Sequence, residues 1–160
     1  MARPMTVRLG QPTDRMPPFK FSAYTRVGFS DTDAQGIVYY GRYLPYFDQA
    51  RVEYERHLGL LGRAAAGEEL VMRASTVVYE APARFDDLLE VFVRTKRIGR
   101  SSLTNSYCAY RVDDGVLMCT AEQTLVLVAA PERRPTPIPD AYRRTVAAFE
   151  GDDLEGGAAA

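Results

Sequence analysis

The sequence predicts an α+β fold in which one amphipathic helix packs on an antiparallel sheet. A single long stretch has helical spacing of its apolar residues, and four β-like runs follow it one after another. Turn signals separate the later runs, at Gly99 and Arg100 and at Asp113, Asp114 and Gly115. Turns of this kind join antiparallel neighbours, and the apolar face of the helix must then be buried against the resulting sheet.

An early strand and one long helix are expected first. Alternating β-formers predict a strand over residues 21–28, followed by a loop over residues 30–36. Over residues 43–58 the apolar positions recur every three or four residues, which predicts a helix with one face toward a core. Gly59 is then expected at the C-cap, because glycine adopts the left-handed conformation without strain.

Four further strands and a short second helix complete the expected fold. The strands are predicted over residues 70–79, 88–98, 101–112 and 116–128. Three prolines end the last strand, and a short helix is expected over residues 140–149. Residues 1–18 are predicted to be a flexible arm, and the tail over residues 151–160 is predicted to be disordered.

The bulk properties favour one domain over residues 19–150, since the whole chain has 160 residues. The net charge of −1 argues against nucleic acid as a partner, because a phosphate-binding surface needs clustered Lys and Arg. No run approaches the ~20 apolar residues of a membrane span, and the first residues lack the apolar core of a signal peptide. We therefore expect a cytoplasmic protein in which Cys108 and Cys119 are free thiols.

The stretch from Phe29 to Tyr43, with the sequence FSDTDAQGIVYYGRY, is the most informative for function. It places the carboxylates of Asp31 and Asp33 beside the expected start of the helix, among apolar and aromatic residues. A carboxylate can act as a general base or a nucleophile, and backbone N–H groups at a helix start can hold a developing oxyanion. The other interpretation is that Asp33 caps a turn, as aspartate often does.

This stretch resembles the hotdog-fold acyl-CoA thioesterases of the 4-hydroxybenzoyl-CoA thioesterase type. Similarity continues at three further places in the same order, so the resemblance covers about residues 21–146. The matching positions are Asp33, Gly36, Ile37, Val38, Tyr39 and Tyr40, then Ala50 and Arg51, residues 81–87, residues 100–102 and residues 134–139.

The resemblance implies a hotdog fold, in which a curved five-stranded antiparallel sheet wraps around one long central helix. It implies acyl-CoA hydrolysis with Asp33 as base or nucleophile, the Tyr40 N–H on the thioester carbonyl, and Gly36 shaping the backbone. Pro45 lacks an N–H, so the helix either begins near Tyr43 or is kinked. A homodimer or homotetramer with active sites in the interface is expected. No metal or redox cofactor is expected, because coenzyme A enters as part of the substrate.

Further residues are candidates for substrate binding. One group lies at a predicted hairpin turn, where Arg, hydroxyl and N–H groups can hold the phosphates of coenzyme A. A solvated, positively charged turn is the alternative interpretation. Asp48 is expected either to meet the far end of the acyl group or to pair with Arg51. The turn candidates are Arg97, Arg100, Ser101 and Ser102, and the candidates for the acyl pocket are Val38, Tyr39 and Tyr43.

Other functions stay open at this point. A thioesterase acting on acyl carrier protein would need a basic rim, which the arginine clusters can supply. A hydratase would need a catalytic His, but the only histidine, His57, lies at the end of the predicted helix. A non-catalytic acyl-CoA-binding protein would keep the fold without turnover. A Gly-x-Ser-x-Gly motif, metal-ligand spacing and nucleotide-binding glycine patterns are absent from the sequence.

Overall fold

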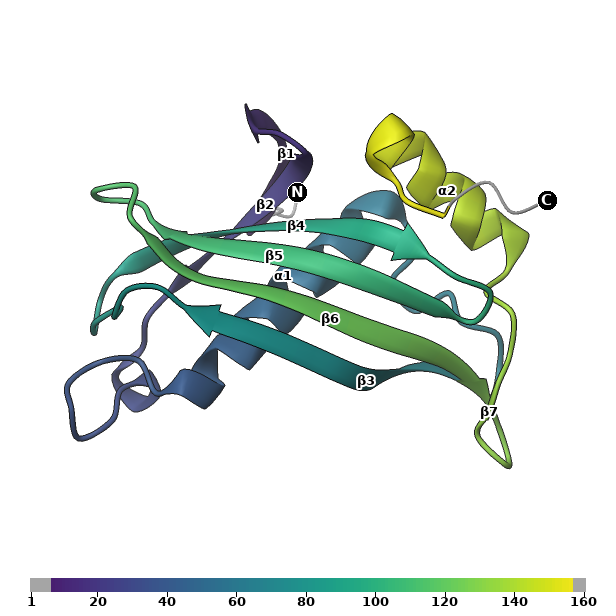
Figure 1. Cartoon of the computed structure of the whole chain (residues 1–160), viewed down its shortest axis with the longest axis horizontal. Coiled ribbons are helices and arrows are strands. Elements are labelled where there is room, and N and C mark those ends of the chain that lie inside the picture. The colour runs from purple at the N-terminus through teal and green to yellow at the C-terminus, as the bar shows by residue number, and fades with distance from the viewer. Residues whose placement is uncertain (1–6, 157–160) are drawn as a thin grey trace, which may run out of the picture.

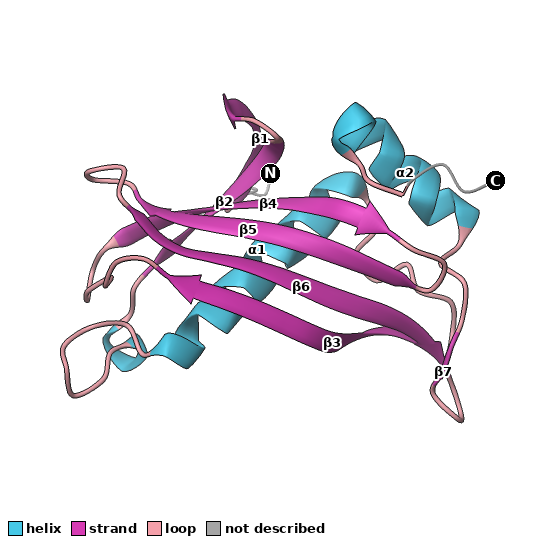
Figure 2. Ribbon diagram, viewed as in Figure 1, coloured by secondary structure: helices cyan, strands magenta, loops and turns pink. Residues whose placement is uncertain are grey.

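A computed structural model describes residues 7–156, and it shows one antiparallel sheet with a long helix across one face (Figures 1 and 2). The sheet order is β1-β2-β4-β5-β6-β3, with β7 also paired to β6. The architecture is therefore the predicted α+β class. The strands are β1 (Gly10–Met16), β2 (Phe19–Arg26), β3 (Glu68–Tyr79), β4 (Leu88–Ile98), β5 (Ser102–Arg111), β6 (Leu117–Ala129) and β7 (Arg134–Pro135).

Helix α1 (Tyr43–Leu58) has the predicted bounds. Its buried face carries Phe47, Ala50 and Tyr54, and it packs against β2 and β4. Gly59 ends the helix at a φ of 71°, and its N–H donates to the Arg56 carbonyl, as expected for a glycine C-cap. The 3₁₀ turn η2 (Tyr40–Arg42) precedes α1, so the helix begins at Tyr43 and Pro45 falls in its first turn, where a missing N–H costs no hydrogen bond.

The hydrophobic core has two parts. The first lies between α1 and the sheet, where Phe21, Phe47, Leu89 and Tyr107 are almost fully buried. The second lies under helix α2 (Asp140–Glu150), which crosses the far end of the sheet, and it comprises Ile98, Leu103, Leu125, Leu127, Ile138 and Val146. Leu58, the last residue of α1, packs against both parts.

The predicted number of five strands was too low. The prediction of a flexible arm over residues 1–18 was also wrong for part of that segment. Residues 10–16 form β1, which pairs antiparallel with β2, while residues 1–6 lie outside the described part of the chain. β1 is an edge strand held by backbone hydrogen bonds and by an ion pair between Arg15 and Glu90. Its side chains are largely exposed, so no alternating apolar pattern marks it in the sequence.

The prediction of a disordered tail was also wrong for its first residues. The 3₁₀ turn η3 (Gly151–Asp153) follows α2, and the Lys20 ammonium lies 2.7 Å from the Asp153 carboxylate. The Glu155 N–H donates to the Lys96 carbonyl at 2.8 Å. Polar and backbone contacts therefore order this segment, and the remaining tail residues, 157–160, lie outside the described range.

Candidate active site

The predicted loop over residues 30–36, which precedes α1, is closed by backbone hydrogen bonds around Asp33. Its N–H donates to the Ile37 carbonyl at 3.0 Å, and its carbonyl accepts from Gly36 N–H at 3.0 Å. Gly36 has a φ of 74°, and within residues 7–156 no atom beyond the glycine and its two chain neighbours lies within 4 Å of the position that a Cβ would take. The glycine is required here by the left-handed backbone rather than by a close neighbour.

The two aspartates of the loop have different surroundings. Oδ2 of Asp31 accepts from the Gly28 N–H and from the Tyr46 hydroxyl, both at 2.8 Å, and its Oδ1 lies 3.6 Å from Nε of Arg42. Asp33 accepts one hydrogen bond, from the Gln35 N–H to Oδ1 at 2.8 Å. Within residues 7–156, Oδ2 of Asp33 has no hydrogen-bond partner or ion pair, in contrast to the carboxylate of Asp31.

Tyr40 lies where the loop enters the helical segment. It is the first residue of η2, so its N–H has no intrahelical acceptor, and the dipole of the following helix makes this end positive. The Tyr40 carbonyl accepts from the Tyr79 hydroxyl at 3.0 Å, which ties this point to the end of β3. The loop thus presents a carboxylate and an available N–H at the same end of α1.

The aromatic residues of the motif divide between surface and core. The rings of Tyr39 and Tyr40 lie 4.3 Å apart, and both rings are exposed. Tyr43 is buried, and burial raises the pKa of its hydroxyl to about 12, so the group stays neutral near neutral pH. Val38 is also buried, with its N–H donating to the Ala83 carbonyl at 2.8 Å. Among the three acyl-pocket candidates, only Tyr39 therefore has an exposed side chain in this chain.

Within residues 7–156, none of the remaining candidates forms a hydrogen bond or an ion pair with Asp33. Asp48 is on α1, with its carboxylate 3.5 Å from the Arg51 guanidinium. The turn with Arg97 and Arg100 lies at the opposite end of β4, which with 11 residues is about 36 Å long. Neither of these arginines forms an ion pair within residues 7–156. One chain alone therefore does not bring this turn to the loop.

Backbone contacts hold the same turn in shape. The Ser101 carbonyl accepts from the Leu127 N–H at 2.8 Å, and the Arg143 guanidinium donates to the Arg100 carbonyl at 2.7 Å. The Gly99 N–H donates to the Ser102 carbonyl at 2.7 Å. His57 lies in the last turn of α1, likewise at the far end of the helix from Asp33.

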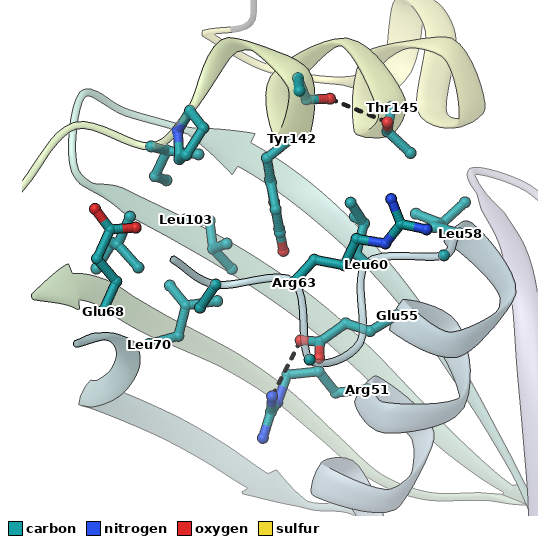
Figure 3. Close-up of a pocket in the computed structure, with 17 residues that line it drawn as sticks. Arg51, Glu55, Leu58, Leu60, Arg63, Glu68, Leu70, Leu103, Tyr142 and Thr145 are labelled. Carbon is teal, nitrogen blue, oxygen red and sulfur yellow. Dashed lines mark hydrogen bonds and ion pairs between the residues drawn. The ribbon is translucent and has the colours of Figure 1, made fainter. Parts of the chain in front are cut away.

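The sequence reasoning missed a cavity of about 480 Å³ beside the C-terminal half of α1. Figure 3 shows Tyr142 of α2 pointing toward the α1 residues Arg51 and Glu55 across this space. Nη1 of Arg51 lies 3.1 Å from Oε1 of Glu55. Their i, i+4 spacing predicts the ion pair, but nothing local in the sequence predicts that α2 closes over it.

The structure was also searched for a membrane-spanning helix and for a metal site. Within residues 7–156, no helix combines the length and apolar character needed to cross a membrane. In the same part of the chain, no group of three His, Cys, Asp or Glu side chains is placed to hold a metal ion.

Comparison with known proteins identifies the class to which this fold and loop belong. A family model described as the Thioesterase-like superfamily matches residues 27–146. The acyl-CoA thioester hydrolase YbgC of Escherichia coli O6:H1 is 34% identical over 116 residues, which are 71% of this chain and 86% of that protein. The chain therefore belongs to the Thioesterase-like superfamily, and the resemblance to hotdog thioesterases is confirmed.

Solved structures agree with this assignment at the level of the fold. The crystal structure of Slr0204, a 1,4-dihydroxy-2-naphthoyl-CoA thioesterase from Synechocystis, has a TM-score of 0.74 at 21% identity and covers 81% of this chain and 96% of that chain. The PA2801 protein from Pseudomonas aeruginosa has a TM-score of 0.71 at 29% identity, with 79% of this chain and 97% of that chain covered. The hotdog-like arrangement is thus shared with thioesterases.

Proposed function

We propose that this protein hydrolyses acyl-CoA thioesters to the free acid and coenzyme A. The observation that carries the proposal is the contrast between the two loop aspartates. Asp31 is occupied by two hydrogen bonds and an arginine, whereas Oδ2 of Asp33 has no partner within residues 7–156. The relationship to YbgC, an acyl-CoA thioester hydrolase by name, supports the choice of substrate class.

The proposed chemistry needs only groups of this chain, water and the substrate. Asp33 takes a proton from water, the water oxygen attacks the thioester carbon, and the Tyr40 N–H donates to the oxyanion that forms. The C–S bond then breaks, and the thiolate of coenzyme A leaves and is protonated. Direct attack by Asp33, giving a mixed anhydride that water hydrolyses, is the other route open to a carboxylate. Neither route requires a metal or redox cofactor.

We further propose that the working enzyme is a homodimer, alone or within a tetramer, formed through β3. This strand is an edge of the sheet, and such edges invite pairing with another chain. Met72, Val78 and Tyr79 on β3 are exposed apolar side chains. Antiparallel pairing of two copies sets the start of β3 in one chain against its end in the other. The loop of one copy would then lie near the cavity and the arginine turn of its partner.

The test is thiol release from aromatic and from short, medium and long acyl-CoAs, comparing the wild type with Asp33→Asn. Asparagine keeps the size of the side chain and the turn but cannot accept the proton, so the rate should fall by about 10²–10⁴-fold. Binding of the acyl-CoA should persist, which calorimetry with the Asn variant measures. Full activity in this variant would overturn the role of Asp33.

Two alternatives make different predictions in the same experiment. Release from acyl carrier protein thioesters but from no acyl-CoA would identify a protein-borne substrate, for which the exposed Arg97 and Arg100 offer a basic surface. Acyl-CoA binding without thiol release by the wild type would identify a non-catalytic binding protein.

A further inference from the structure

Tyr79 reaches the proposed active site from outside the loop and the helix that form it. It is the last residue of β3, and its hydroxyl donates at 3.0 Å to the carbonyl of Tyr40, which lies 39 positions earlier in the chain. The proposed hydrolysis gives roles to Asp33 and to the Tyr40 N–H and none to this tyrosine. Its hydrogen bond nevertheless ends on the residue that carries the proposed oxyanion donor, so it bears on how that donor is held.

The sheet fixes the backbone of Tyr79. This residue pairs with Cys119 on β6, and the Cys119 side chain is fully buried. The next two residues, Glu80 and Ala81, both donate their N–H groups to the Met118 carbonyl, at 2.9 Å and 3.2 Å. Met118 is fully buried as well. The Tyr79 side chain therefore projects from a point of the backbone that is attached to the core.

Aromatic contacts direct the Tyr79 ring toward the start of α1. Its centroid lies 5.8 Å from that of Tyr43 and 6.4 Å from that of Tyr40, both in an edge-on arrangement. Such edge-to-face pairs are favourable at these separations. Tyr43 is buried and packs in turn on Phe47 of the core. The hydroxyl is thus held at the Tyr40 backbone by a rigid frame.

Hydrogen bonds on both sides fix the direction of the Tyr40 N–H. This N–H belongs to the peptide group between Tyr39 and Tyr40, and a planar peptide group turns only through the dihedral angles of the residues it joins. On one side, the Tyr39 N–H donates to the Asp31 carbonyl at 2.9 Å. On the other side, the Tyr40 carbonyl accepts from Tyr79. The first bond joins two backbone groups, whereas the second comes from a side chain and can be deleted by substitution.

We propose that Tyr79 is a positioning residue, whose hydroxyl orients the Tyr40 backbone so that its N–H meets the oxyanion of the reacting thioester. The inference rests on the proposed hydrolysis and on the Tyr40 N–H as the oxyanion donor. Stabilisation of an oxyanion depends on donors that are already in place when the charge develops. Loss of the tether should therefore lower kcat more than it weakens substrate binding, because Tyr79 acts through Tyr40 and not on the substrate.

The first test is Tyr79→Phe, which deletes the hydroxyl and keeps the ring. The value of kcat should fall by about three- to tenfold, as expected for one hydrogen bond. KM for the acyl-CoA should change by less than about twofold, because the loss falls on the transition state. Tm should change by no more than about 2 °C, since Tyr40 and Tyr79 lie at the surface, where water can replace the hydroxyl.

Tyr110→Phe is the matched control. It deletes the same group from a tyrosine on β5, outside the proposed active site, and should leave kcat, KM and Tm unchanged. A Tyr79→Phe enzyme with unchanged kcat, or with a loss confined to KM, would overturn the inference. So would an equal loss of kcat in both variants.

Two coenzyme A analogues separate donor orientation from general binding. A trifluoromethyl ketone thioether of coenzyme A hydrates to a tetrahedral centre with an ionisable oxygen, which resembles the oxyanion. An S-alkyl coenzyme A of equal length lacks that oxygen. In calorimetry, Tyr79→Phe should weaken binding of the ketone by the factor lost from kcat/KM and leave binding of the S-alkyl compound unchanged. Equal weakening of both would show that Tyr79 only shapes the pocket.

A pH profile tests the donor itself. Tyr79→3,5-difluorotyrosine keeps the ring, but fluorine lowers the pKa of the phenol toward neutral pH, and the ionised group can no longer donate. Relative to the wild type, kcat should fall as pH rises through that lowered pKa. The same replacement at Tyr110 should reproduce the wild-type profile. A wild-type profile with the fluorinated residue at position 79 would contradict the inference, and this profile decides where Tyr79→Phe does not fold.

The inference and the proposed hydrolysis fail separately. If Tyr79 has no effect on kcat but Asp33→Asn loses thiol release, the hydrolysis stands and only the positioning role is wrong. If Asp33→Asn keeps thiol release, the proposed chemistry is wrong. The comparison of the two analogues needs no turnover, so it decides the role of Tyr79 in that case as well.

Discussion

Replacing the two loop aspartates one at a time should separate stability from catalysis. The Asp31 side chain is 18% exposed, and its carboxylate accepts two hydrogen bonds at 2.8 Å. Hydrogen bonds to a charged acceptor contribute roughly 1 kcal/mol more than those to a neutral one, so Asp31→Asn should cost about 2 kcal/mol of unfolding free energy. For a chain of this size that lowers Tm by about 4–8 °C.

Asp33→Asn should behave in the opposite way. Asparagine can still accept the Gln35 N–H in the same turn, so the unfolding free energy should change by no more than about 0.5 kcal/mol. Thiol release should nevertheless fall by about 10²–10⁴-fold. Differential scanning calorimetry and thiol release on both variants give the comparison, and Tyr46→Phe serves as a control, since it removes one donor to Asp31 and should also lower Tm.

The reasoning is refuted if the two effects are exchanged. An Asp31→Asn enzyme with unchanged Tm and no thiol release would assign the chemistry to Asp31. An Asp33→Asn protein that loses several degrees of Tm would show that Asp33 mainly stabilises the loop.

Three other predictions concern the core, the second helix and the sheet edge. Phe47→Ala empties a fully buried site against Tyr107 and should cost about 3–5 kcal/mol, measured by urea unfolding. Burial raises the pKa of the Glu150 carboxyl above its ordinary 4.5. The folded state then keeps a proton that the unfolded chain releases, so stability falls as pH rises above that value. Glu150→Gln should remove this fall; an unchanged pH profile of Tm would contradict it. Val78→Lys should dissociate the β3 dimer in analytical ultracentrifugation. A variant that stays as dimeric as the wild type would show that another surface forms the dimer.

Elements with a local signal could be predicted from the sequence. Helix α1 has the predicted bounds because its apolar spacing, the proline in its first turn and Gly59 all act within the helix itself. The strand from Leu88 to Ile98 was likewise predicted in full. Strand β1 was missed because backbone pairing with β2, rather than a side-chain pattern, holds it in place.

By itself, the sequence determined the class of fold, the family and the loop that we propose as the active site, because these depend on residues close together in the chain. Only the tertiary structure decided which loop aspartate is available, since the hydroxyl that occupies Asp31 comes from Tyr46 on α1. It alone revealed the cavity, whose lining residues run from Arg51 to Thr145. Contacts between distant segments depend on how helices pack on the sheet, and no local pattern records that packing.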